Sequence, residues 1–205
     1  WSLGKSITIN DHSINDEVQI RRLKELLLSS IEQQMISDVP LGVFLSGGID
    51  SSMVASMMQS VSNKPIDTFS IGFSEKEYDE SSYARSISNY LNTHHHELIV
   101  DSKMPLDVVT ELPNIYDEPY ADASGIPTYI LAKMTRNNVT VSLSGDGADE
   151  LFGGYERYYK GMSFWSKINL IPLPIRRIMK NILLSFSNDF YNRINNRYFN
   201  SGKLG

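Results

Sequence analysis

Residues 41–52, LGVFLSGGIDSS, contain the turn that decides the fold. A short apolar run, Leu41 to Leu45, predicts a strand, and the stretch from Ser51 to Val61 predicts a helix. A strand that feeds a Gly-Gly turn at a helix start forms an anion site, because the first N–H groups of the helix have no internal partners and the helix dipole adds partial positive charge. The two glycines let a phosphate group approach the backbone without hindrance from a Cβ atom.

This turn lacks the Lys-Ser or Lys-Thr pair of the Walker phosphate loop, so transfer of a γ-phosphoryl group by that route is not expected. A cradle with no lysine and one carboxylate, Asp50, suits the binding and release of pyrophosphate if a divalent cation bridges the carboxylate to the phosphates. This chemistry implies cleavage of ATP between its α and β phosphates. The alternative is a plain Gly-Ser turn between a strand and a helix.

The composition of the chain restricts the class of protein. Its 205 residues, 41% of them hydrophobic, suit one α/β domain with a helical extension. A net charge of −5 disfavours a nucleic-acid partner, and the lack of cysteine excludes disulfides, thiolate metal sites and a cysteine nucleophile within the sequence. Without a signal peptide or a membrane-spanning apolar run, we expect a cytoplasmic protein with no membrane partner. Since the chain starts at Trp1 and ends in Ser-Gly-Lys-Leu-Gly, we expect a fragment of a longer polypeptide.

Apolar periodicity predicts strands that alternate with helices. The expected strands are 41–45, 66–73, 95–100 and a buried 139–143; the expected helices are 15–37, 51–61, 81–91, 105–116, 127–137 and a series from 150 onward, broken at 171–174. This alternation implies an α/β fold with a doubly wound, mainly parallel sheet, helices on both faces and a helical C-terminal extension. We divide the chain into a linker remnant (1–14), a nucleotide-binding domain (15–160) and a truncated helical extension (161–205).

A second motif follows the expected fourth strand. Residues 144–155, SGDGADELFGGY, carry three carboxylates, those of Asp146, Asp149 and Glu150. These groups would repel one another unless cations or hydrogen-bond donors compensate them, and Mg²⁺ bound to pyrophosphate would do so. We assign this metal to the pair Asp50 and Asp149. The alternative is a solvated acidic loop that caps the next helix.

The second motif also leaves room for the nucleoside. Ser144 and Gly145 are small, so an adenine ring or a ribose can approach closely. Ligands of parallel sheets bind beyond the carboxyl ends of the strands, and the turns at 46–51 and 144–150 both lie at such ends. We therefore expect the two turns to meet around the triphosphate of ATP.

Three further features are interpreted as structural. Of His94, His95 and His96, only the first and third share a face of a strand, and no third metal ligand has convincing spacing. A polar strand entrance is therefore favoured over a metal site. The aromatic residues within 155–165 have helical spacing, which favours core or inter-helix packing over base stacking. The basic cluster at 176–180 indicates a solvated helix face.

The turn SGGIDS at 46–51 resembles the pyrophosphate loop (PP-loop) of the N-type ATP pyrophosphatases, which include asparagine, GMP, NAD and argininosuccinate synthetases and tRNA-modifying ligases. Together with the motif at 144–155, it resembles the C-terminal synthetase domain of the glutamine-hydrolysing asparagine synthetase family. Segments 39–45, 68–73 and 117–127 are also similar to that family. The second motif is the specific one, because GMP and NAD synthetases would share only the first.

The resemblance implies an adenine nucleotide alpha hydrolase-like fold for 15–160, as an ATP pyrophosphatase (synthetase) domain, and a role for each motif residue. Residues that would contact ATP at adenine and ribose, mainly through backbone groups, are Leu45, Ile71, Ser144 and Gly145. Residues that would hold pyrophosphate are Ser46, Gly47, Gly48, Asp50 and Ser51. Asp146 would stand where the family has an acidic residue needed to form β-aspartyl-AMP, with Ser124 and Tyr155 on the aspartate side.

The implied function is that of an ATP-dependent amidoligase of asparagine biosynthesis, which adenylates the side-chain carboxylate of aspartate, releases pyrophosphate and lets ammonia form asparagine. ATP and Mg²⁺ are the implied cofactors. Ammonia would come from a glutaminase domain that the chain lacks, so the fragment is not expected to hydrolyse glutamine, and a homodimer of the parent protein is left open. The alternatives are a related amidotransferase for another carboxylate, of the surface-polysaccharide or β-lactam type, and a non-catalytic nucleotide-binding module.

Overall fold

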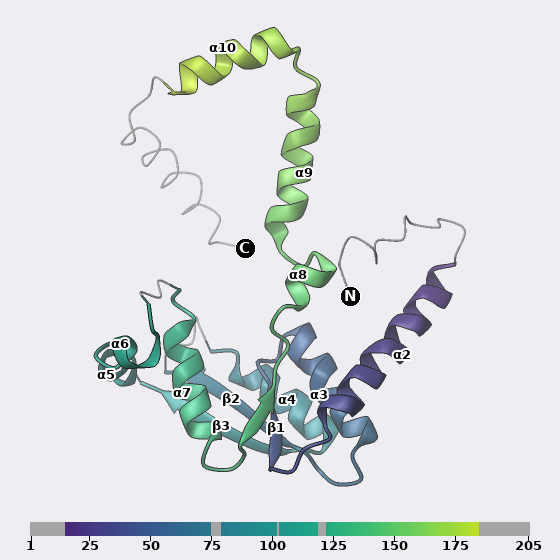
Figure 1. The fold of residues 1–205 in the computed structure, drawn as a ribbon, viewed down its shortest axis with the longest axis vertical. Coiled ribbons are helices and arrows are strands. Elements are labelled where there is room, and N and C mark those ends of the chain that lie inside the picture. Colours follow the sequence, from purple (N-terminus) through teal and green to yellow (C-terminus); the bar gives the residue numbers. More distant parts are fainter. Residues whose placement is uncertain (1–14, 75–78, 102, 119–121, 185–205) are drawn as a thin grey trace. The chain divides into compact units, whose positions relative to one another are not determined.

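The computed structural model describes residues 15–74, 79–101, 103–118 and 122–184 (Figure 1). The chain divides into two compact units, Trp1–Gly147 and Ala148–Gly205, and each is described by itself. The expected linker at 1–14 and the expected helical stretch beyond 184 lie outside the described residues. The domain limits inferred from the sequence stay a prediction.

The first unit is built on a parallel sheet. Its strands are β1 (Leu41–Phe44), β2 (Asp67–Phe73), β3 (His94–Val100) and β4 (Val141–Leu143), in the spatial order β3-β2-β1-β4. Every neighbouring pair is parallel, and the register places Val43 of β1 beside Thr68 on one side and Leu143 on the other. The α/β class and the parallel sheet expected from the sequence are therefore confirmed.

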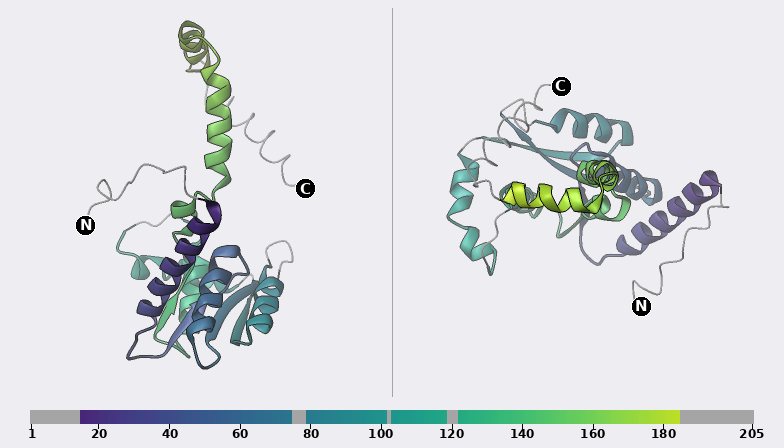
Figure 2. Two further views of the ribbon diagram at one scale, coloured as in Figure 1. Left: turned by 90° about the vertical axis from the view of Figure 1, so that its right-hand side faces the viewer. Right: turned by 90° about the horizontal axis from the view of Figure 1, so that it is seen from above.

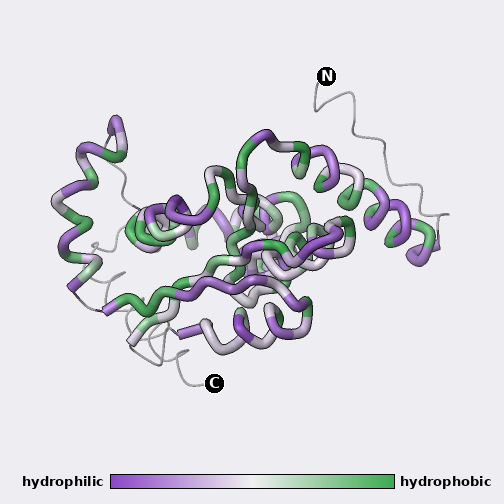
Figure 3. Tube along the Cα trace, turned by 90° about the horizontal axis from the view of Figure 1, so that it is seen from below, coloured by the Kyte–Doolittle hydropathy of each residue, from purple (hydrophilic) through white to green (hydrophobic). Residues whose placement is uncertain are grey.

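One face of the sheet is covered by α3 (Ile49–Val61) and α4 (Ser81–Leu91), with α2 (Asp16–Gln34) beside α3 (Figures 1 and 2). The start of α2 is capped by Asn15, whose side chain accepts a hydrogen bond from the Glu17 N–H at 3.1 Å. Hydrophobic and hydrophilic residues alternate along α2, as its amphipathic pattern predicts (Figure 3). The buried core of this face contains Ile31, Val43, Leu45, Ala55, Met58, Ile66 and Ala84.

The opposite face is covered by α5 (Met104–Val109), α6 (Leu112–Ile115) and α7 (Gly125–Thr135), around a smaller core of Val100, Val108 and Ile130. The helical pattern expected over 105–116 is confirmed, but it is divided into two short helices. Pro113 lies in the first turn of α6 and has no N–H to donate to the turn before it, so the helix cannot run through. Helices on both faces of the sheet confirm the doubly wound arrangement.

The expectation of a buried fourth strand over 139–143 is wrong. β4 is limited to Val141–Leu143 and lies at the edge of the sheet, where β1 is its hydrogen-bonded neighbour. The Val141 side chain is 42% exposed as a result. An apolar run alone predicts a strand but not its place in the sheet, and edge strands keep one flank open.

The described part of the second unit consists of α8 (Ala148–Phe152), α9 (Glu156–Asn169) and α10 (Leu173–Leu184). Gly153, with φ +68°, separates α8 from α9, and the expected break near 171–174 is confirmed before α10. Of the core or inter-helix packing expected for the aromatic residues, inter-helix packing stays a prediction. Burial in a core is wrong for four of them, which are 41–66% exposed: Tyr158, Tyr159, Phe164 and Trp165. Among the described residues, no helix has the length and apolar character needed to cross a membrane.

Candidate functional site: two turns at a switch point of the sheet

The first turn begins where β1 ends. The Leu45 N–H donates to the Phe69 carbonyl at 2.8 Å, which extends the pairing with β2 by one residue. The Leu45 side chain is buried in the core, so a ligand at the sheet edge can meet only its backbone. This matches the backbone role that the resemblance implies for Leu45.

Serine hydroxyl groups hold the first turn together from within. The Ser46 N–H donates to Ser51 Oγ at 3.2 Å, the two hydroxyl groups lie 3.0 Å apart, and the Gly48 N–H donates to Ser46 Oγ at 3.3 Å. Among the described residues, the N–H groups of Ile49, Asp50 and Ser51 have no hydrogen-bond acceptor. The start of α3 therefore presents free donors, as expected of an anion site.

Gly47 is held against the start of α4. Its φ of +87° lies in the region that favours glycine. A Cβ atom built on Gly47 would lie 2.6 Å from Tyr83 Cβ and 2.9 Å from the Ala84 nitrogen. The first turn thus rests directly on the first turn of α4, a contact that no local pattern in the sequence indicated.

The second turn rests on the first. A Cβ atom built on Gly145 would lie 2.7 Å from the Ser51 nitrogen and 2.9 Å from the Asp50 carbonyl carbon. The backbone of the second turn therefore touches the N-terminal turn of α3, so the two motifs, far apart in sequence, meet in space. Ser144 joins the turn through its Oγ, which accepts a hydrogen bond from the Asp146 N–H at 3.3 Å.

The strand order explains this contact. From β1 the chain moves through β2 to β3 on one side, and then returns to place β4 on the other side of β1. The loops after β1 and β4 consequently diverge from adjacent strands, at the point where the strand order reverses. Open α/β sheets bind ligands in the crevice at such a point.

Two acidic side chains of the first unit lie at the turns, those of Asp50 and Asp146. Among the described residues, the carboxylates of Asp50 and Asp146 make no hydrogen bond and no ion pair. Uncompensated oxygen ligands beside free N–H donors fit a magnesium-bound pyrophosphate. Within the described ranges, no group of three or more His, Cys, Asp or Glu has metal-binding geometry. Asp149 lies in the second unit, and its pairing with Asp50 stays a prediction.

The other expected site residues lie on three separate elements. Ile71 is on β2 and packs against the smaller core. Ser124 precedes α7, and its N–H donates to Asp122 Oδ1 at 2.8 Å, a bond that holds the pKa of that carboxyl below its usual range. Tyr155 belongs to the second unit, where its hydroxyl donates to Glu150 Oε1 at 2.6 Å; this bond raises the pKa of Tyr155 to about 12.

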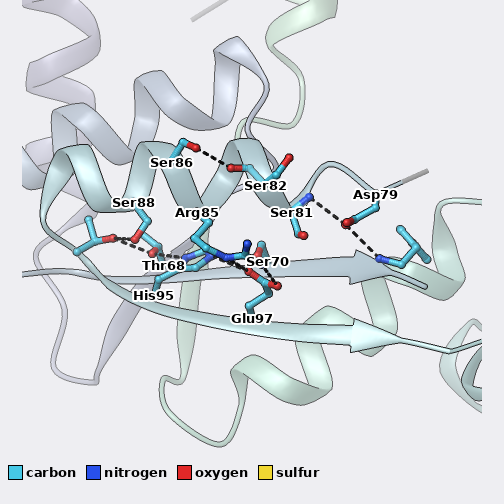
Figure 4. Close-up of polar contacts among 12 residues, drawn as sticks. Thr68, Ser70, Asp79, Ser81, Ser82, Arg85, Ser86, Ser88, His95 and Glu97 are labelled. Atoms are coloured by element: carbon cyan, nitrogen blue, oxygen red, sulfur yellow. Dashed lines mark hydrogen bonds and ion pairs between the residues drawn. The ribbon is translucent and has the colours of Figure 1, made fainter. Parts of the chain in front are cut away.

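One histidine of the run, His95, is linked to α4 through the side chains of Thr68 and Thr93 (Figure 4). His95 bridges two buried hydroxyl groups of β2: its Nδ1 lies 2.9 Å from Thr68 Oγ1 and its Nε2 lies 3.1 Å from Ser70 Oγ. On the other side of the strand, His96 stacks on Phe69 and its Nε2 lies 2.8 Å from Asp67 Oδ1. These protein partners account for His95 and His96 without a metal.

His95 is expected to make folding sensitive to mild acid. Burial lowers the pKa of His95, with smaller contributions from His96 and Arg85 in the same direction, whereas Glu97 opposes the shift. As the pH falls below the ordinary imidazole pKa of about 6.5, the unfolded chain takes up the proton first, so the free energy of unfolding decreases. Between pH values of about 7.5 and 5.5, the melting temperature of wild type should fall further than that of His95→Gln. Equal decreases would contradict a buried neutral imidazole.

The sequence is similar to that of known proteins. Residues 22–201 match the asparagine synthase family. Glutamine-hydrolyzing asparagine synthetase 1 of Bacillus subtilis is 35% identical over 166 residues, which are 80% of this chain and 26% of that protein. A Methanocaldococcus jannaschii protein that bears the name asparagine synthetase 2 is 44% identical over 148 residues, 71% of this chain and 28% of that protein.

Among solved structures, the NH3-dependent NAD synthetase of Campylobacter jejuni in complex with nitrate matches with a TM-score of 0.46 and 16% identity, over 66% of this chain and 60% of that chain. A match of this extent does not bear on the family. The chain spans 26–28% of the length of the two curated relatives above. Because the family match runs through nearly all of its residues, the chain belongs to the asparagine synthase family.

Proposed function

We propose that this chain supplies the ATP-binding and carboxylate-activating part of an asparagine synthetase. The observation that carries the proposal is the contact of Gly145 with the backbone of Asp50 and Ser51, at the point where the strand order reverses. An ATP molecule bound at these two turns would meet free N–H donors from one turn and small residues from the other. This arrangement suits a nucleotide that is cleaved between its α and β phosphates.

Different residues would contact the adenosine and the phosphates of the nucleotide. Backbone groups of Leu45, Ile71, Ser144 and Gly145 would contact the adenosine. The first turn would hold the β and γ phosphates through the N–H groups at the start of α3, with Ser46, Gly47, Gly48, Asp50 and Ser51 around them. Asp50 and Asp149 would hold Mg²⁺, which when bound supplies positive charge that offsets the charge of the departing pyrophosphate.

The proposed reaction proceeds in two displacements. An oxygen of the aspartate side-chain carboxylate attacks the α-phosphorus, and the bond from that phosphorus to the bridging oxygen breaks, so that pyrophosphate leaves. Donors fixed at the start of α3 stabilise the charge that develops on the leaving group. Ammonia then attacks the acyl carbon of β-aspartyl-AMP, AMP leaves and a proton is lost, which yields asparagine. Asp146, beside the second turn, is assigned to formation of the acyl-adenylate.

Ammonia would be supplied by a glutaminase part of the full-length protein. The relatives are named as glutamine-hydrolyzing enzymes, whereas this sequence contains no cysteine that could serve as the nucleophile for glutamine. The residues of this chain would therefore consume ammonia rather than produce it.

The test is release of pyrophosphate by the full-length protein with MgATP, ammonium and candidate acceptors. We expect release with aspartate, and a reduction of roughly a hundredfold or more in Asp50→Asn, because the variant keeps the shape of the side chain but loses charge near the leaving group. Release with another carboxylate and not with aspartate would favour the related amidotransferases. ATP binding with no release for any acceptor would favour a nucleotide-binding module.

A further inference from the structure

Helix α4 is held on the sheet without large side chains at its most buried positions. The fully buried residues of α4 are Ser81, Ala84 and Ser88, which recur at three- and four-residue steps and face the sheet. Small residues allow close approach to the strands, while Ile87 and Leu91 of α4 are only partly buried against the core. Polar contacts at the buried positions therefore act together with this apolar packing to set the position of the helix.

Those contacts form a ladder of polar groups, of which Ser88, Thr68 and Ser70 are buried and Thr93 and His95 are half-buried (Figure 4). Ser88 Oγ lies 2.7 Å from Thr93 Oγ1, which lies 2.9 Å from Thr68 Oγ1, and the ladder continues through His95 to Ser70 Oγ. The Ser88 and Thr68 side chains are essentially inaccessible to water, at 1% and 0% exposure. Each group thus depends on its neighbours in the ladder for a hydrogen bond.

The rim of the ladder and the start of α4 are also tied to the sheet. Arg85 of α4 donates to both carboxylate oxygens of Glu97 on β3, at 3.1 and 2.6 Å. Asp79 Oδ1 accepts hydrogen bonds from the Ser81 N–H at 3.1 Å and, more weakly, from the Phe73 N–H at 3.4 Å. The first turn of α4 is therefore fixed relative to the carboxyl end of β2.

We propose that the ladder Ser88–Thr93–Thr68–His95–Ser70 positions α4 so that its first turn supports Gly47, and that Thr68 and His95 are positioning residues for MgATP binding. The link is the close contact of Gly47 with Tyr83 and Ala84, which transmits any displacement of α4 to the turn. The inference rests on the proposed role of that turn in holding pyrophosphate. It adds a support that meets α4 at Ser88, one turn beyond the Ala84 that touches Gly47.

Thr68→Val tests the ladder, because valine keeps the shape of threonine and removes the hydroxyl group at the centre of the chain of hydrogen bonds. Calorimetric titration of the full-length protein with MgATP should show a Kd raised roughly three- to tenfold, the equivalent of one lost hydrogen bond. Thr68→Ser keeps the hydroxyl group and should bind close to wild type. Ser88→Ala removes the hydroxyl group at the α4 end of the ladder. It replaces Thr68→Val as the test variant if Thr68→Val does not fold.

Val108→Ala is the matched control, because it removes buried volume from the core on the opposite face of the sheet. It should lower the melting temperature and leave the Kd for MgATP unchanged. If Thr68→Val loses stability but binds MgATP like wild type, the ladder is only structural and the inference is wrong. If wild type itself does not bind MgATP, the proposed function fails instead.

Discussion

Gly47→Ala is expected to destabilise the protein by about 2–4 kcal/mol, from left-handed backbone strain and from overpacking against α4. The residue has φ +87°, and its new Cβ atom would meet Tyr83 Cβ at 2.6 Å and the Ala84 nitrogen at 2.9 Å. Backbone atoms of a helix cannot move aside as the end of a flexible side chain can. Urea denaturation of the full-length protein measures the loss, and MgATP binding should weaken with it.

Gly147→Ala is the matched control for Gly47→Ala. Gly147 has the same φ of +87°, but a Cβ atom there would meet no atom within 4 Å. Gly147→Ala should therefore lower the free energy of unfolding by the backbone strain alone, about 1 kcal/mol. The difference between the two variants measures the contact of the first turn with α4. Equal losses would show that α4 does not press on Gly47.

Gly145→Ala is expected to separate the two turns. The added Cβ atom would lie 2.7 Å from the Ser51 nitrogen and 2.9 Å from the Asp50 carbonyl carbon, so one backbone must move. We expect a loss of about 1–3 kcal/mol in the free energy of unfolding without nucleotide. Because the two turns would move apart, the Kd for MgATP should rise at least roughly tenfold.

Gly48→Ala is the control for Gly145→Ala. It replaces another glycine of the proposed phosphate site without creating a close contact. The nearest atom to a Cβ on Gly48 is Ser46 Oγ at 3.4 Å, an ordinary contact. Without nucleotide, this variant should unfold within about 1 kcal/mol of wild type. If Gly145→Ala were equally stable without nucleotide, the two turns would not touch, and the proposed nucleotide site would lose its main support.

Local elements followed closely from the sequence. The helix predicted at 81–91 has the same bounds as α4. The strands predicted at 41–45, 66–73 and 95–100 each differ from the observed strand by one residue at one end. Apolar spacing, glycine turns and proline are local signals, so they report local structure well. The effect of Pro113 was missed because the apolar pattern continued across it.

Signals of side-chain chemistry were harder to interpret. The run His94–His96 has a polar appearance in the sequence, yet His95 is part of a partly buried ladder because two hydroxyl groups of β2 face it. The aromatic residues of α9 have the spacing of a packed helix but are exposed in their unit. Whether a polar or apolar residue is buried depends on elements far along the chain, which periodicity does not report.

By itself, the sequence determined the two turns and their residues, and it predicts an anion site at the first of them, because the free N–H groups of a helix start and the freedom of glycine are properties of a few adjacent residues. Only the tertiary structure decided that β4 pairs with β1 at the edge of the sheet, and so that Gly145 rests on Ser51. Strand order depends on the packing of the whole unit. Only glycine fits at position 145 without a shift of the chain, because the backbone of Asp50 and Ser51 lies where a Cβ atom would be.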